Sequence, residues 1–207
     1  MAPERFVRWI GAFAEHHGEL AVEAGPDAAS FLAADRAAAR CLIPFPPLAA
    51  GPGSVASRIA DHALADRTVG VLLVRLGGYA AGVFTGGALV SSKVGSRLVH
   101  GRSAAGGTSQ RRFARRRENQ ARQALAAAAD TAAAVFGSYA GRLDAVVLGG
   151  DRRAVSALRS DSRLAPYFEL ATEAFLAVPD PRLSVLRDAP RRFRAIRITV
   201  TGPGRLS

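Results

Sequence analysis

The chain has 207 residues, of which 49% are hydrophobic, so it is expected to fold as one domain, or one domain with an extension, around a substantial core. Its net charge of +11 at pH 7 rests on arginine, since Lys93 is the only lysine, and it favours an anionic partner. The chain has one cysteine, which argues against a disulfide framework, and its four histidines lack metal-ligand spacing, which argues against a metal site. It has no apolar run long enough to span a membrane. We expect a cytoplasmic monomer without a cofactor.

Residues 1–66 are predicted to form a mainly helical extension that packs on the core. Apolar residues recur at helical spacing between Phe6 and Phe13, and the prolines and glycines of residues 44–53 interrupt the chain. Ser54 is the expected cap of the helix that follows. The elements expected here are a helix over 4–16, a strand over 19–23, an alanine-rich helix over 30–40 and a helix over 54–65.

Residues 67–207 are predicted to form the main domain, of the α/β class. Apolar runs over 69–76 and 79–85, joined by Gly-Gly, predict a hairpin, and a second Gly-Gly turn adds a third strand over 88–100. The elements expected after a long helix are a strand over 143–148, a helix over 152–160 capped by Asp151, a strand within 168–178, a helix over 181–188 and a last strand over 194–200. A meander followed by alternating strands and helices predicts a mixed β-sheet with flanking helices.

A single long helix is predicted over residues 111–137, which are rich in arginine, glutamine, glutamate and alanine. At 1.5 Å per residue it would be about 40 Å long. Its second half carries a stripe expected to be buried, made of Leu125, Ala128, Ala132, Val135 and Phe136. Its first half is too charged for a core and is expected to project past the sheet into solvent.

The loop before this helix has no residue that could anchor it in a core. Every residue from 101 to 107 except Arg102 is glycine, alanine or serine, and Gln110 stands where the loop meets the helix. Ordering such a glycine-rich segment costs much conformational entropy. Residues 101–111 are therefore expected to form a mobile arm that orders against a partner.

The charge around this arm has one sign. From Thr68 to Arg117 there is no acidic residue, and on the long helix only Glu118 and Asp130 could pair with arginines. A one-signed surface of this kind is typical of proteins that bind a phosphate backbone. The residues predicted to bind RNA are Lys93, Arg97, Arg102, Arg111, Arg112, Arg115, Arg116 and Arg117.

The other motifs in the sequence give little evidence of function. No Gly-Lys-Ser/Thr follows the glycine-rich loop, so it is not a P-loop, and it lacks the dinucleotide fingerprint. The run Gly149-Gly150-Asp151 is predicted to be a tight turn into a capped helix, and His100 a strand-end histidine without a special role. No Ser/His/Asp or Cys/His set and no metal-binding carboxylate cluster is evident.

A strand meander, a glycine-rich loop with one glutamine and a long basic helix together resemble the middle, catalytic domain of eukaryotic and archaeal class-1 translation release factors. In that family the loop carries Gly-Gly-Gln into the ribosomal peptidyl-transferase centre. Here Thr108 and Ser109 separate Gly107 from Gln110. This Gly-x-x-Gln form is closer to the release-factor-like peptidyl-tRNA hydrolases of ribosome-associated quality control, the VLRF group, whose actinobacterial members are short. The resemblance covers roughly residues 68–200.

The resemblance implies hydrolysis of the ester between a nascent peptide and tRNA on a stalled large ribosomal subunit. It implies that ribosomal RNA and peptidyl-tRNA are the partners and that Gln110 positions water and substrate through its amides. The loop residues it implicates beside Gln110 are Gly106, Gly107, Thr108 and Ser109. Two alternatives stay open: an endonuclease that cuts the tRNA 3′ CCA end, and a non-catalytic module that binds RNA or the ribosome.

Overall fold

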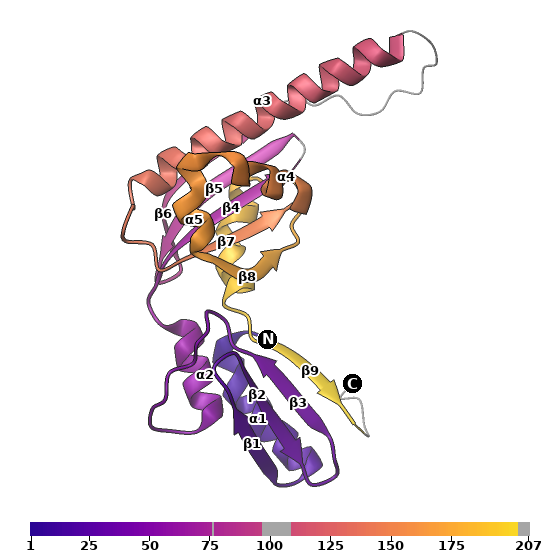
Figure 1. The fold of residues 1–207 in the computed structure, drawn as a ribbon. Helices are drawn as coiled ribbons and strands as arrows, with labels where there is room; N and C mark the ends of the chain where they lie inside the picture. Colours follow the sequence, from indigo (N-terminus) through magenta and orange to yellow (C-terminus); the bar gives the residue numbers. More distant parts are fainter. Residues whose placement is uncertain (76, 97–108, 203–207) are drawn as a thin grey trace. The chain divides into compact units, whose positions relative to one another are not determined.

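The computed structural model of the protein describes residues 1–75, 77–96 and 109–202, and for residues 109–117 it describes only the backbone, apart from the side chain of Arg115. The chain folds into two units, each with its own sheet (Figure 1): Met1–Ala65 with Arg191–Ser207, and Asp66–Pro190. None of the helices in the described ranges is both long and apolar enough to cross a membrane.

The first unit is a four-stranded antiparallel sheet with two helices. Its elements are α1 (Pro3–His17), β1 (Leu20–Ala24), β2 (Ala28–Ala33), β3 (Ala38–Leu42), α2 (Val55–Leu64) and β9 (Arg197–Thr201). The strands are ordered β1-β2-β3-β9. The buried stripe of α1, with Phe6 and Phe13, packs in one core with Phe31 of β2 and Ile59 of α2. As expected, Ser54 caps α2 by accepting a hydrogen bond from the Ser57 N–H at 3.1 Å.

The alanine-rich segment 30–40 is not a helix, so that prediction was wrong. It forms the end of β2, a turn and the start of β3, with Arg36 at a φ of 73° in the turn. Ala29 and Phe31 of β2 and Ala39 and Cys41 of β3 are buried, which is the alternation of a half-buried strand. Alanine fits either structure when a core is available, so tertiary packing overrides its helix propensity.

The predicted division of the chain differs from the structure in two ways. Residues 1–66 contain three strands and are not mainly helical, and the last strand belongs to the first unit rather than to a domain over 67–207. Strand β9 pairs antiparallel with β3, from Ala38 opposite Thr201 to Leu42 opposite Arg197. Next to it, the Met1 amino group donates to the Ile196 carbonyl, and the Ile196 N–H donates to the Met1 carbonyl, both at 2.9 Å. The chain therefore leaves the first unit after α2 and returns to complete its sheet.

The second unit holds a five-stranded mixed sheet, ordered β6-β5-β4-β7-β8. Its elements are β4 (Thr68–Arg75), β5 (Gly78–Thr85), β6 (Ala88–Ser96), α3 (Ser109–Gly137), β7 (Ala145–Gly150), α4 (Arg152–Ala157), the 3₁₀ turns η1 (Leu158–Ser160) and η2 (Ser162–Leu164), α5 (Ala165–Glu169), β8 (Ala171–Leu176) and α6 (Leu183–Arg187). The short helix α7 (Ala189–Phe193) spans the boundary between the units. Strands β4, β5 and β6 form an antiparallel meander, and β7 and β8 continue the sheet in parallel. The predicted mixed α/β fold is confirmed.

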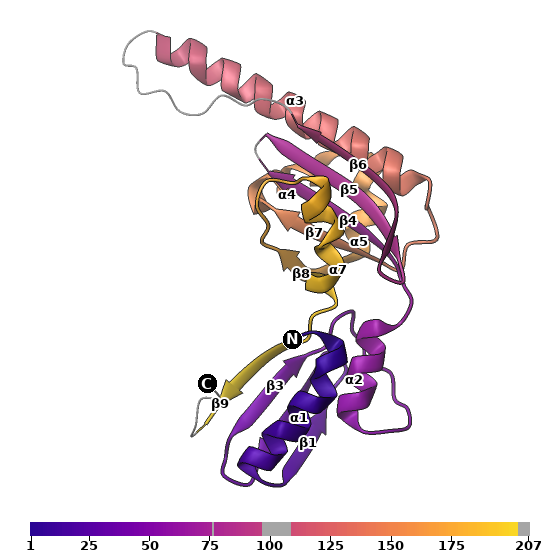
Figure 2. The ribbon, with the colours of Figure 1, turned by 180° about the vertical axis from the view of Figure 1, so that it is seen from behind.

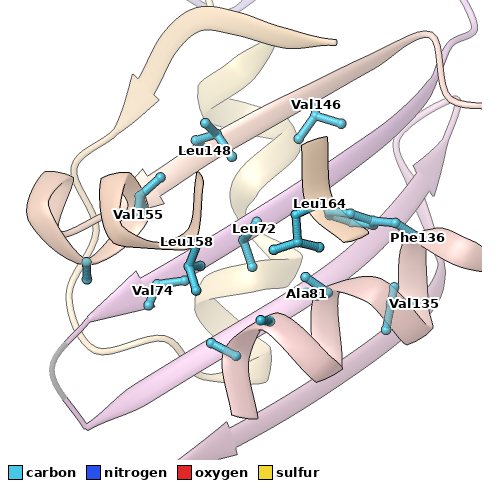
Figure 3. Packing of buried hydrophobic residues seen from close by; sticks show 14 of the residues in the cluster. Leu72, Val74, Ala81, Val135, Phe136, Val146, Leu148, Val155, Leu158 and Leu164 are labelled. Carbon is cyan, nitrogen blue, oxygen red and sulfur yellow. The ribbon is translucent and has the colours of Figure 1, made fainter. Parts of the chain in front are cut away.

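The core of this unit lies between one face of the sheet and the helices α3 and α4 (Figure 3). Leu72, Val74 and Ala81 of the sheet pack with Phe136 of α3 and Leu164 of η2. The predicted helix stripe is confirmed, since Ala128, Ala132, Val135 and Phe136 are buried and Leu125 packs against them. On the opposite face Leu186 of α6 covers β5 so closely that a Cβ on Gly82 would lie 2.9 Å from its Cδ2.

The turn after β7 is the capped turn that the sequence predicts. The Asp151 side chain accepts hydrogen bonds from the N–H groups of Arg153 at 2.7 Å and Ala154 at 3.2 Å. Gly150 has a φ of +101°, and a Cβ there would lie 2.1 Å from the Val74 carbonyl oxygen. Glycine is required at this position because no other residue fits both the backbone angle and the space.

Replacing Gly150 by alanine is expected to lower the free energy of unfolding of the second unit by about 2–5 kcal/mol, since backbone strain and overpacking add. Urea denaturation measures the loss. Gly137→Ala is the matched control, because nothing lies within 4 Å of a Cβ there and the residue ends a helix. Equal stability of the Gly150 and Gly137 variants would contradict the turn geometry.

Candidate functional site

The second half of helix α3 packs on the sheet, and its first half projects beyond the sheet. Strands β4, β6 and β7 run in the same direction, and α3 connects β6 to β7, so the helix runs back against them. Its N-terminal end therefore lies beyond the carboxyl ends of these strands (Figures 1 and 2). The buried residues of its described part fall between Ala128 and Phe136, whereas Arg115, Glu118 and Arg122 are exposed. The predicted projection past the sheet is confirmed.

The helix begins earlier than predicted. Ser109 and Gln110, which we expected only in the mobile arm, lie in the first turn of α3 together with Arg111, the predicted first residue of the helix. Glutamine and arginine are good helix formers, so nothing in the sequence stops the helix short of the glycine-rich run. The rest of the expected arm, residues 101–108 with Arg102, Gly106, Gly107 and Thr108, lies outside the described residues, as do Arg97 and His100.

The backbone of Gln110 lies at the positive end of the α3 dipole. The first four N–H groups of an α-helix have no acceptor within the helix, and the N–H of Gln110 is one of these. The partial positive charge of the helix N-terminus adds to that of the arginines that follow. A group that develops negative charge next to this end of α3 would be stabilised by both.

The described basic side chains of the predicted RNA-binding set lie on the surface. Lys93 pairs with Ala81 across β6 and β5, and paired residues share a face of the sheet, so Lys93 lies on the side that α3 covers. Its side chain is exposed, and so is that of Arg115 on α3. The remaining members of this set on α3 are Arg111, Arg112, Arg116 and Arg117, which follow within its first turns.

An ion-pair cluster ties the second half of α3 to the turn η2. The Arg163 guanidinium lies 2.9 Å from the Asp130 carboxylate on α3 and 2.6 Å from that of Asp161. The sequence left Asp130 as a possible partner for the helix arginines, and it gave Arg163 no role. Spacing along one helix cannot reveal a partner on another element, so this contact has no sequence signal.

The Asp161–Arg163 pair predicts an acid-dependent loss of stability. Hydrogen bonds from the Arg163 guanidinium hold the pKa of the Asp161 carboxyl below its usual value of 3.8. A carboxyl whose pKa is lower in the folded than in the unfolded state stabilises the fold at higher pH, and this is lost as the pH falls through the folded pKa. Asp161→Asn should therefore lower the melting temperature at pH 7, and the gap from the unmodified protein should close below about pH 4. A gap independent of pH in thermal unfolding would contradict this assignment.

Other reactive side chains lie in the first unit and are engaged in its packing. Cys41 is fully buried, which raises the pKa of its thiol to about 12 and leaves it unreactive. The buried His17 places its Nδ1 2.8 Å from Asp35, whose pKa is lowered chiefly by that hydrogen bond. Within the described ranges, no group of three histidine, cysteine or acidic side chains could hold a metal ion.

Residues 67–199 match the family described as Actinobacteria/chloroflexi VLRF1 release factor. Among solved structures, the crystal structure of the archaeal translation termination factor aRF1 is similar, with 14% sequence identity and a TM-score of 0.46, over 61% of this chain and 36% of that chain. No curated protein matches the chain. The family match covers well over half of the chain and nearly all of the second unit. The chain therefore belongs to the Actinobacteria/chloroflexi VLRF1 release factor family.

Proposed function

We propose that this protein releases nascent peptides from tRNA on stalled large ribosomal subunits by hydrolysing the peptidyl-tRNA ester. The observation that carries the proposal is the projecting half of α3, which holds Gln110 in its first turn and is anchored to the sheet by its second half. Membership of a release-factor family supports a role in translation at the ribosome. The protein would then act in the cytoplasm.

The partners that fit this helix are ribosomal RNA and peptidyl-tRNA. A rigid helix with exposed arginines can enter a channel lined by phosphates, and contacts to the backbone would fix its position without reading sequence. The ion pair between Asp130 and Arg163 holds the helix against the second unit, so RNA contacts along α3 also position the unit. We propose that the protein binds the subunit as a monomer.

The reaction adds water to an ester. The water oxygen attacks the ester carbonyl carbon, its proton passes to the leaving ribose oxygen, and the products are a peptide carboxylic acid and tRNA with a free 3′-terminal ribose. The carbonyl oxygen becomes an oxyanion in the transition state, and one preorganised donor to it is worth a few kcal/mol. Glutamine has no useful pKa, so Gln110 would act by positioning rather than as a base.

The loop residues before Gln110 would serve this positioning. Gly106 and Gly107 lack a side chain, so the backbone there can approach the substrate closely. Thr108 and Ser109 lie between them and Gln110. The N–H of Gln110 and its side-chain amide are the two donors that could face the oxyanion or the attacking water.

Product analysis tests the proposal against its alternatives. Purified large subunits that carry labelled peptidyl-tRNA are mixed with the protein, and the peptide and the tRNA 3′ end are followed on gels. Hydrolysis leaves full-length tRNA whose terminal ribose has a free 2′,3′-diol, so periodate oxidises it. A peptide that retains nucleotides would instead show an endonuclease that cuts the 3′ CCA end. Binding without either product would show a non-catalytic module.

A further inference from the structure

A second group of arginines lies on the second unit, outside the set that the sequence singled out. Arg152 and Arg153 begin α4, and Arg159 lies in η1. All three side chains are exposed. These three residues are called the α4 arginine surface below.

Two members of this surface are held in place by aromatic rings. The Arg152 guanidinium lies 4.3 Å from the centre of the Phe175 ring, and that of Arg159 lies 4.7 Å from the centre of the Phe168 ring. Stacking uses one face of the planar guanidinium and leaves the N–H groups at its edge for hydrogen bonds. A guanidinium ordered in advance loses less side-chain entropy when it binds, and its fork of donors fits phosphate oxygens.

The charge of this surface is not neutralised within the described part of the chain. Arg163, close by, pairs with Asp130 and Asp161. In the described ranges no carboxylate lies within 4.0 Å of the three guanidinium groups. The Asp151 side chain accepts from backbone N–H groups and so caps α4.

Two members of the α4 arginine surface, Arg152 and Arg153, begin α4 and lie on the same side of the sheet as α3, at the end from which α3 projects. Helix α4 follows β7 directly, so its first residue, Arg152, lies at the carboxyl end of β7. Figure 1 shows α4 at the end of the sheet from which α3 projects. The Asp130–Arg163 ion pair and a ring contact between Phe136 and Tyr167, with 5.2 Å between centres, tie α3 to the segment that follows α4. Helices α3 and α4, which carry the two groups of arginines, therefore belong to one packed unit.

We propose that the α4 arginine surface is a second contact with the phosphate backbone of ribosomal RNA, at the base of the projecting helix. The proposal rests on the proposed function for the choice of the ribosome as partner, and it is independent of the chemistry of Gln110. Such a contact would add to the affinity that the arginines of α3 contribute. Loss of this contact should weaken binding of the whole protein without changing the reaction once the complex has formed.

The test compares two double variants of the full chain with the same change in charge. Arg152→Gln/Arg153→Gln removes part of the α4 arginine surface and keeps the α4 cap, which uses backbone groups. Arg182→Gln/Arg187→Gln removes two exposed arginines at α6, on the opposite face of the sheet. Binding is measured with purified large ribosomal subunits and with a labelled RNA duplex, over a series of salt concentrations. Circular dichroism confirms that both variants fold.

The Arg152/Arg153 variant should bind subunits about tenfold more weakly at 0.1 M salt, with a salt slope shallower by about one to two units, and should also bind the duplex more weakly. The α6 variant should behave like the unmodified protein. Equal losses in both variants would overturn the proposal, because they would reflect net charge alone. A loss on subunits but not on the duplex would also overturn it, because the partner would then be a ribosomal protein.

The proposed function and this proposal fail in different ways. Single-turnover release at saturating subunits should be unchanged in the Arg152/Arg153 variant, because these arginines are proposed to act in binding and to take no part in the reaction. If this variant binds and releases peptide normally, the proposed second contact is contradicted and the proposed hydrolase activity is not affected. If the unmodified protein releases no peptide and only the Arg152/Arg153 variant loses binding, the proposed hydrolase activity is contradicted and the proposed RNA contact is supported.

Discussion

Gln110→Ala is expected to release peptide about 10²-fold or more slowly than the unmodified protein while it still binds peptidyl-tRNA-loaded large subunits. The reason is that a positioned amide acts mainly in the transition state, where the oxyanion forms, and adds little to ground-state binding. Single-turnover release from a purified stalled complex measures the first quantity, and subunit binding measured in parallel gives the second.

The position of Gln110 in the first turn of α3 allows a variant that separates side chain from backbone. Proline is tolerated in the first turn of a helix, where its missing N–H has no partner within the helix. If the N–H of residue 110 is the donor, Gln110→Pro should be the harsher change and Gln110→Ala the milder one. Full release activity in both variants would contradict a catalytic role and favour the RNA-binding module.

Replacing the arginine block of α3 by glutamine is expected to cause the largest loss of binding. The block comprises Arg111, Arg112, Arg115, Arg116 and Arg117. Each lost phosphate contact should flatten the salt dependence of ribosome or RNA affinity by at most about one unit of slope, so affinity should fall steeply. Because this part of α3 projects from the sheet, the second unit should keep its fold.

Circular dichroism and thermal unfolding check that the second unit keeps its fold in the block variant. Glutamine keeps a helix propensity close to that of arginine, so the helix itself should remain. The double variant at Arg182 and Arg187 removes two positive charges from another surface, against five in the block variant, and so controls for net charge only in part. Unchanged affinity and salt slope in the block variant would mean that the arginines of α3 form an ordinary solvated surface.

The sequence predicted the second unit well because its signals are local. Gly86 and Gly87 adopt φ angles of 57° and 97°, as the predicted tight turn of a hairpin requires. The long helix combines many good helix formers with an apolar stripe in its second half only. Such a pattern predicts both the burial of Phe136 and the projection of Arg115 without knowledge of the fold.

In the first unit α1, β1 and α2 lie close to the predicted ranges, but the rest of the sheet was not predicted, because it depends on pairing between distant segments. Ala38 and Ala39 face Thr201 and Val200 across the sheet, and nothing in either segment specifies the other. Alanine-rich stretches also lack the bulky alternation that separates a strand from a helix. The helix expected over 30–40 and the assignment of the last strand to the main domain were wrong for these two reasons.

In the candidate site, too, the local features could be predicted from the sequence and the contacts between distant segments could not. The arginines of α3 are contiguous in the sequence, so their charge is evident there. The pairing of Arg163 with Asp130, and the position of Arg152 at the base of α3, arise only when separate elements meet in the fold. The residues around Gln110 make it a candidate in the sequence, but its place in a helical turn rather than in the loop was not predicted.

The most direct test of the central claim is to run the reaction in water enriched in oxygen-18. If water attacks the peptidyl ester, the terminal carboxylate of the released peptide should carry one oxygen-18 atom, and the tRNA should be full-length with none. Mass spectrometry of both products from a single turnover on stalled large subunits decides the matter. A released peptide without the label, or one that still bears nucleotides, would contradict ester hydrolysis by this protein.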